Sequence, residues 1–202
     1  AYYMDFETCG SAIPLYDDSS PYQQIPFQFS VHVVKEKGAQ PEHFSFLADG
    51  TDDPRPEFLA KLQEVLGSKG SIIAYNAGFE MGILKKCAEV FSKYKNWTES
   101  IEERIIDLLK PFSRFAYYHP KQDGSCSLKK VLPALTGKSY DDMEIGDGGT
   151  ASSEYCRVTF TEDNIDKSKV RKLLEEYCGL DTMGMVDIID QLYKSLNKEV
   201  KK

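Results

Sequence analysis

The spacing of hydrophobic residues changes once along the chain, and this change limits the possible folds more than any other feature. Residues 2–7, 27–34 and 43–47 alternate or are rich in aromatic and β-branched residues, and polar segments such as residues 14–26 separate them. Three closely spaced strands joined by loops predict an antiparallel meander. Beyond residue 50, helical spacing alternates with short apolar runs. We therefore predict a mixed sheet of antiparallel and parallel strands with helices packed against it.

The second part of the chain carries recognisable start and stop signals for helices. Asp53 is predicted to cap a helix whose first residue is Pro54, and Gly67 and Gly70 are predicted to end it. The elements expected after it are a buried strand at 71–75, a helix at about 79–94, a short strand around Asp107, a small helix capped by Ser127, a loop at 137–150, and a helical region at about 165–196 with bends at Gly179 and Gly184.

Length and composition indicate one globular domain. The chain has 202 residues, of which 41% are hydrophobic and 28% charged. Its strand pattern begins at the second residue, so we expect residues 1–202 to be a single domain excised from a longer protein. No apolar run reaches the ~20 residues of a membrane span, and no signal-peptide pattern opens the chain, so a cytoplasmic setting is expected. The five cysteines form no C-x-x-C pair and are expected to be free thiols.

The charge is unevenly distributed along the chain. The net charge is −7, which by itself does not indicate a nucleic-acid-binding protein. Between residues 104 and 138, however, there are seven basic residues and two acidic ones. This basic segment is compatible with phosphate contacts, and it is equally compatible with solvated helix surfaces.

Two carboxylates lie two residues apart in the first strand. Because side chains two apart in a strand share a face, Asp5 and Glu7 are predicted to project together, with Met4 and Phe6 on the opposite face. Adjacent acids repel one another, and a bound divalent cation relieves that repulsion. The alternative is an edge strand with a polar outer face.

A third carboxylate follows the strand at 71–75. Asn76 ends this strand, the chain turns at Gly78, and Glu80 falls in the first turn of the next helix. This arrangement delivers an acid to the carboxyl end of a central strand, where open α/β sheets place their sites. The alternative is that Asn76 caps the helix and Glu80 only complements the helix dipole.

The last pair lies in the helical region near the C-terminus. Tyr177 and Asp181 are four residues apart, so their side chains share one helix face. A phenol and a carboxylate presented together can position a water beside a metal ion. The alternative is a partly buried tyrosine hydrogen-bonded to a surface acid.

The combination and order of these motifs resemble the DEDD superfamily of 3′–5′ exonucleases, which includes RNase D and the proofreading exonucleases. The tyrosine type fits, because the histidine type requires His where this chain has Glu176. The segments YMDFET, AYNAGFE, DLL, GSCSLKKVLPAL and YCGLDT are similar to an uncharacterised bacterial domain family assigned to that superfamily. Its members often follow a RecB-like nuclease region, which would be the covalently linked N-terminal partner. The resemblance spans nearly the whole chain and implies an RNase H-like five-stranded mixed sheet.

The resemblance also implies roles for individual residues. Asp5, Glu7, Glu80 and Asp181 are expected to hold two divalent ions, Mg²⁺ or Mn²⁺, ~3.5–4 Å apart, with Asp5 shared between them. Tyr177 is expected to orient the attacking water. The implied activity is metal-dependent hydrolysis of phosphodiester bonds in single-stranded nucleic acid.

Further residues are expected near the substrate, a single DNA or RNA strand entering by its 3′ end. Asp107 lies where relatives often carry another acid, Ser127 and Leu128 match a substrate-contacting segment, and the two lysines that follow are placed to reach phosphates. The full set is Thr8, Asn76, Phe79, Asp107, Ser127, Leu128, Lys129 and Lys130. The aromatics Phe112, Phe115, Tyr117 and Tyr118 are interpreted either as core residues or as a stacking platform for bases.

One departure from the superfamily pattern leaves the activity open. Glu80 occupies the position of the usual Asp, which implies either an active site with altered metal preference or an attenuated enzyme. A rival hypothesis is therefore a nucleic-acid-binding module that kept the fold and lost catalysis. A second rival is a phosphatase of the haloacid dehalogenase type, suggested by D-x-E-T at Asp5. That chemistry has no role for the Tyr177–Asp181 pair.

Overall fold

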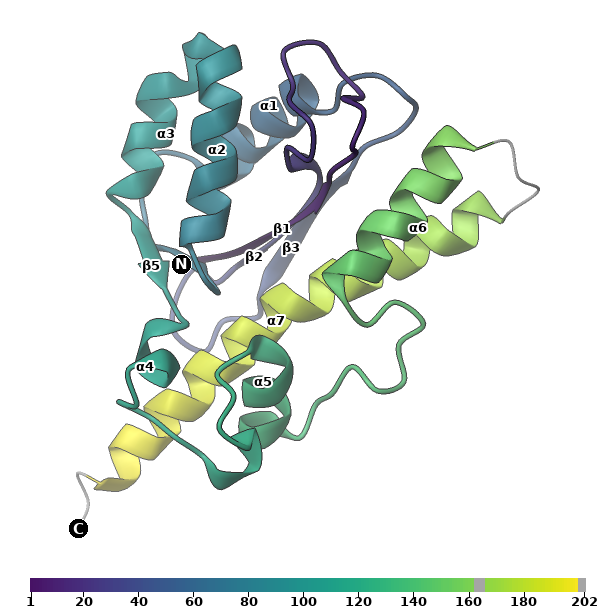
Figure 1. Ribbon diagram of the computed structural model, residues 1–202. Coiled ribbons are helices and arrows are strands. Elements are labelled where there is room, and N and C mark those ends of the chain that lie inside the picture. Colours follow the sequence, from purple (N-terminus) through teal and green to yellow (C-terminus); the bar gives the residue numbers. More distant parts are fainter. Residues whose placement is uncertain (162–165, 200–202) are drawn as a thin grey trace.

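The computed structural model of the chain describes residues 1–161 and 166–199, and a five-stranded sheet forms its centre (Figure 1). The strands are β1 (Tyr2–Cys9), β2 (Ile25–Val33), β3 (Glu42–Leu47), β4 (Ile72–Ala74) and β5 (Ile105–Asp107). Their order across the sheet is β3-β2-β1-β4-β5. β1, β2 and β3 pair antiparallel, whereas β4 is parallel to both β1 and β5. The predicted α/β fold with a mixed RNase H-like sheet is confirmed.

Helices cover both faces of this sheet. They are α1 (Arg55–Leu66), α2 (Gly78–Val90), α3 (Lys95–Glu102), α4 (Lys110–Ser113), α5 (Leu128–Thr136), α6 (Gly148–Phe160) and α7 (Lys167–Glu199), with the short 3-10 helices η1 (Ser92–Tyr94) and η2 (Pro120–Gln122). In Figure 1, α1, α2 and α3 lie on one side of the sheet, and α6 and α7 lie on the other. Among the described residues, no helix combines the length and apolar character that a membrane crossing requires.

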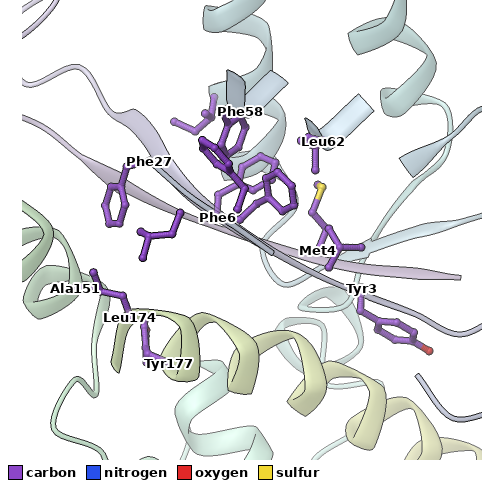
Figure 2. Close-up of a cluster of buried hydrophobic side chains, with 14 of the residues drawn as sticks. Tyr3, Met4, Phe6, Phe27, Phe58, Leu62, Ala151, Leu174 and Tyr177 are labelled. Carbon is purple, nitrogen blue, oxygen red and sulfur yellow. The ribbon is translucent and has the colours of Figure 1, made fainter. Parts of the chain in front are cut away.

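The alternation of β1 divides the hydrophobic core into two layers. Met4 and Phe6 point toward α1, and the rings of Phe6 and Phe58 meet edge to face with centroids 4.9 Å apart. Figure 2 shows these side chains on one face of the sheet and Tyr3 on the face that α7 covers, together with Tyr177. Asp5 and Glu7 have the same parity as Tyr3, so they are directed toward α7. The predicted division of β1 into an acidic and an apolar face is confirmed.

Buried polar contacts fix the position of α7 on the sheet. The side-chain amide nitrogen (Nε2) of Gln28 on β2 donates to the backbone carbonyl oxygen of Leu174 at 2.9 Å. The hydroxyl of Thr182 lies 2.7 Å from the Ser30 hydroxyl and 2.8 Å from Nδ1 of His32. Each contact satisfies a buried polar group that would otherwise be costly. The helix that carries Tyr177 and Asp181 is therefore held in one register against β2.

Several element boundaries differ from the prediction. The first helix begins at Arg55 rather than Pro54, because the Asp53 carboxylate accepts hydrogen bonds from the backbone N–H of Arg55 and from its buried guanidinium. The helix expected at 79–94 ends at Val90, and η1 and α3 follow it. The expected start of the last helix, Ile165, lies outside the described residues.

The helix α6 was not predicted from the sequence. The loop predicted at 137–150 ends three residues earlier, because the Asp147 side chain accepts from the backbone N–H of Thr150 at 2.9 Å and caps this helix. The two glycines that precede Thr150 lower the intrinsic helix propensity and hid this start signal. α6 packs on β1, and its Tyr155 ring stacks on Phe27 with centroids 3.8 Å apart.

The expected bends at Gly179 and Gly184 are replaced by close packing, since α7 is continuous through both residues. A Cβ at Gly179 would lie 3.7 Å from the His43 ring, and one at Gly184 would lie 2.9 Å from a methyl carbon of Leu132. Leu132 belongs to α5 and is fully buried. Gly184 thus sets the distance between α5 and α7.

We expect Gly184→Val to lower the free energy of unfolding by about 1–3 kcal/mol, because the added methyl groups overpack a filled contact. Chemical denaturation with urea measures this change. Gly82→Val is the matched control, since Gly82 is an exposed helical glycine and a Cβ added there would meet no described neighbour within 4 Å. Equal effects of the two substitutions would contradict the assigned role of Gly184.

Candidate active site

The structure brings the five residues singled out for catalysis to one cavity. Its volume is about 530 Å³, and its walls come from β1, the junction of β4 and α2, α6 and α7. The lining includes Asp5, Glu7, Glu80, Tyr177 and Asp181. These residues span most of the sequence, so only the tertiary fold makes them neighbours.

β1 presents its two carboxylates side by side. Asp5 pairs with Ser30 and Glu7 with Gln28 across the antiparallel ladder. The register shifts between Glu7 and Thr8, where β2 contributes one extra residue. Such bulges sit next to functional sites in other proteins, because they turn the strand and redirect a side chain. The irregularity lies directly beside the second acid of the D-x-E motif.

The turn between β4 and α2 places the third carboxylate. Asn76 adopts a left-handed conformation, with φ of 70°, which asparagine tolerates better than most residues. The Asp107 carboxylate, at the end of β5, accepts from the backbone N–H of Asn76 and of Leu109, each at 3.0 Å. These two hydrogen bonds fix the turn, so that Glu80, in the first turn of α2, enters the cavity.

Glu80 is buried without a full set of partners. Only 2% of its surface is exposed, and its Oε2 atom has no hydrogen-bond partner within residues 1–161 and 166–199. Burial raises the pKa of Glu80 to about 8. A buried carboxylate oxygen without a donor is costly, and a bound cation would satisfy it.

On α7, Tyr177 and Asp181 share one face as predicted, and a second tyrosine joins them. The hydroxyl of Tyr140, from the segment between α5 and α6, donates to Oδ1 of Asp181. Hydrogen bonds from Tyr140 and Tyr177 favour the ionised carboxylate, although burial dominates and raises the pKa of Asp181 to about 6. The Tyr140 and Tyr177 rings lie 6.1 Å apart.

The four carboxylates destabilise one another's ionised forms. Burial is the main cause and raises the pKa of Asp5 well above its ordinary value, with Asp181, Glu7 and Glu80 adding to the increase. Burial and the nearby Asp181 raise the pKa of Glu7 to about 8. In the part of the chain that the structure describes, none of these four acids forms a salt bridge. Such a cluster has the oxygen ligands and the uncompensated charge that hard divalent ions favour.

Lys129 is a cation near this cluster. Its Nζ atom lies 5.5 Å from the ring centre of Tyr177 and 5.8 Å from that of Tyr140. Its positive charge acts to lower the pKa of both Glu7 and Asp181. Lys129 does not line the cavity, but its charge partly offsets that of two of the four carboxylates.

The other predicted substrate-contacting residues fall into two groups. Thr8, Asn76 and Phe79 line the cavity, and 39% of the Phe79 side chain remains exposed. Asp107 lines a different surface pocket, and its carboxylate holds the backbone turn at Asn76. The remaining three do not line the cavity: Ser127, Leu128 and Lys130.

Sequence reasoning missed several residues of the site. Gly148 and Gly149 line the cavity at the start of α6, and a Cβ at Gly148 would lie 3.5 Å from Oε2 of Glu7. The Asp147 cap was the signal that could have located them. Cys178 is buried with its sulfur 3.7 Å from Oδ2 of Asp5, and burial raises its thiol pKa, so it remains a neutral neighbour. Tyr140 had no sequence signal, because it lies in an irregular segment.

The sheet order and the acidic cavity define an α/β protein with an RNase H-like fold and four clustered carboxylates. The fold is similar to part of the family B DNA polymerase from the hyperthermophilic archaeon Pyrobaculum calidifontis. The superposition covers 95% of this chain and 24% of that polymerase, with a TM-score of 0.61 and 16% sequence identity. This likeness concerns the fold.

The chain belongs to the family described as "Domain of unknown function (DUF2779)", which matches residues 2–127. An uncharacterised protein of Mycoplasma pneumoniae is 26% identical over 92% of this chain, and one of Ureaplasma parvum is 24% identical over 98%. The matched regions are 31% and 32% of those two proteins. The chain thus spans about a third of the length of these relatives.

Proposed function

We propose that this domain is a metal-dependent 3′–5′ exonuclease that hydrolyses phosphodiester bonds of single-stranded nucleic acid. The observation that carries the proposal is the convergence of Asp5, Glu7, Glu80 and Asp181, with Tyr177, on one cavity. The likeness of the fold to a DNA polymerase and the motif order along the sequence support the same activity.

The donor set fits two divalent ions such as Mg²⁺ or Mn²⁺. The four carboxylates would hold them, and Oε2 of Glu80 is a buried oxygen that needs such a partner. When bound, the ions supply activation of water and stabilisation of the leaving oxygen. Gly148 leaves space beside Glu7, where any side chain would approach its carboxylate.

Residues of the chain itself orient the water and bind the substrate. The Tyr177 hydroxyl, fixed on α7 beside Asp181, orients the attacking water. Lys129, above the Tyr177 ring, attracts the scissile phosphate. Thr8 and Phe79, at the wall of the cavity, contact the terminal nucleotide. Burial of the cluster limits bulk water and strengthens each of these electrostatic contacts.

The activity test uses single DNA and RNA strands labelled at the 5′ end, incubated with the protein and Mn²⁺ or Mg²⁺. A ladder of products that shorten one nucleotide at a time from the 3′ end is expected. A strand labelled at the 3′ end should release only labelled mononucleotide. Strand binding without shortening in either metal would overturn the proposal and leave a binding module on the same fold.

We also expect Tyr140→Phe to weaken metal binding about 10- to 100-fold, because Tyr140 donates the hydrogen bond that orients the Asp181 carboxylate. Titration of Mn²⁺ followed by calorimetry measures the Kd directly. Tyr94→Phe is the control, since it removes a hydroxyl from another buried tyrosine that does not line the cavity. If the two substitutions leave the Kd unchanged, Tyr140 does not position Asp181.

A further inference from the structure

Two aromatic side chains are exposed on the segment between α4 and α5. Phe115 is 73% exposed and Tyr118 is 47% exposed, and their ring centres lie 6.2 Å apart. Exposed aromatic rings that lie next to each other are unusual on a protein surface and mark interaction sites. Neither ring belongs to the hydrophobic core formed by the described residues.

The backbone holds Phe115 in a costly conformation. Its φ is 54°, in the left-handed region that bulky residues avoid at a cost of roughly 1–2 kcal/mol. The amide of Phe115 donates to the carbonyl oxygen of Phe112 at 3.1 Å, which closes the turn. The backbone N–H of Gly124 donates to the Tyr118 hydroxyl at 3.3 Å. Strain kept in a surface turn that presents a ring to solvent points to a use for that ring.

The aromatic pair adjoins the acidic cavity. Phe115 and Tyr118 line a small cavity of about 110 Å³ together with Phe112 and Cys126. Tyr75 is a lining residue of the acidic cavity. Its ring stacks on Phe112 with centroids 6.3 Å apart, and its hydroxyl donates to the carbonyl oxygen of Cys126. Tyr75 therefore links the wall of the acidic cavity to two residues that line the small cavity.

The surroundings of the pair are positively charged. Arg114 and Lys121 flank the two rings in sequence, Lys130 lies in the first turn of α5, and all three are exposed. None of them forms a salt bridge with an acid among residues 1–161 and 166–199. Asp123 is the acid within the same loop. Unpaired basic groups beside exposed rings are the combination that single-stranded nucleic acid recruits through its phosphates and bases.

We propose that Phe115 and Tyr118 form a base-stacking subsite for single-stranded nucleic acid. A strand whose 3′ end lies in the acidic cavity passes Tyr75 and stacks an upstream base on this pair, with Arg114 and Lys121 on its phosphates. The proposal rests on the proposed function for the direction of the strand. The stacking itself does not require that the strand be cleaved.

The test measures strand binding in EDTA, where no hydrolysis occurs, by the fluorescence anisotropy of a labelled oligothymidylate. Phe115→Ala and Tyr118→Ala are each expected to raise the Kd about 5- to 100-fold. Tyr193→Ala is the matched control, because Tyr193 is 50% exposed, has the Lys37 ammonium over its ring, and lines neither the acidic cavity nor the small one. A Kd unchanged in both variants of the pair, or raised equally in the control, would overturn the subsite.

A second measurement reports stacking directly. In Phe115→Trp, strand binding is expected to quench the new indole fluorescence, and affinity should be retained. Unquenched emission at a saturating concentration of the strand would contradict the proposal. Hydrolysis of the same strand by the wild-type protein in Mn²⁺ separates the two claims. If the wild-type protein cleaves no strand while Phe115→Ala and Tyr118→Ala still bind it more weakly, the exonuclease proposal is overturned and the subsite stands.

Discussion

Asp5→Asn is expected to reduce exonuclease activity by at least about 10³-fold and, at the same time, to stabilise the metal-free protein. Burial raises the pKa of Asp5 well above its ordinary value, and the neighbouring Asp181, Glu7 and Glu80 add to the increase. Replacing it by asparagine eliminates a metal ligand and relieves the repulsion between this position and the other three acids. The Tm in EDTA at pH 8 should therefore rise by about 2–4 °C for each kcal/mol of repulsion removed.

The opposite signs of these two effects separate a lost ligand from a damaged fold. Asp142→Asn is the control, since this exposed acid lies in the segment between α5 and α6 and does not line the cavity. It should change neither the rate of strand shortening nor the Tm. Wild-type activity in Asp5→Asn would refute the assignment of the site.

The second large effect concerns pH and divalent ions. Burial raises the pKa of Glu7 and of Glu80 to about 8 in the folded protein, above the ordinary glutamate value. The folded state therefore binds more protons than the unfolded state. The stability that these protonated glutamates contribute is lost as the pH rises through about 8. We expect the Tm of the metal-free protein to be about 5 °C or more higher at pH 6 than at pH 8.5.

Saturating Mg²⁺ or Mn²⁺ should flatten this dependence, because the ions bind the ionised carboxylates that the folded protein otherwise disfavours. The Tm increase caused by the ion is thus expected to be larger at pH 8.5 than at pH 6, as measured by differential scanning calorimetry. Glu80→Gln should reduce the pH dependence without metal. A metal-free Tm that is higher at pH 8.5 than at pH 6 would contradict the electrostatic description.

Below about pH 6 the buried His32 acts in the opposite direction. Burial lowers the pKa of His32 to about 4, and the adjacent His43 contributes to the decrease. A depressed pKa means that stability is present above the unfolded value of 6.5 and is lost as the pH falls toward 4. His32 should therefore reduce, without reversing, the stability that the carboxylates gain as the pH falls below 6, because several carboxylates with raised pKa values outweigh one histidine.

The sequence predicted the sheet well because strand patterns are local. The alternation in β1 gave the shared face of Asp5 and Glu7, and the helical spacing of Tyr177 and Asp181 gave theirs. The same local reasoning located the strand-to-helix turn that carries Glu80. Each of these inferences needs only the repeat of one element.

Contacts between elements were beyond local reasoning. Tyr140 reaches Asp181 from a segment without periodicity, and the glycines of α6 concealed a helix that closes one side of the cavity. Asp107 was placed near the substrate from its position along the chain, and only the structure shows that its carboxylate holds the backbone of Asn76 and Leu109. Gly184 was interpreted as a bend because the sequence does not show that Leu132 packs against it.

By itself, the sequence determined which residues share a face within each strand or helix, because a backbone repeat of 2 or 3.6 residues fixes that from spacing alone. Only the tertiary structure decided that the faces of β1, α2 and α7 meet at one cavity and bury its carboxylates. Burial and mutual repulsion raise the pKa values of the carboxylates, and the described chain offers no donor to one oxygen of Glu80. Both effects depend on distances through space that no sequence interval encodes.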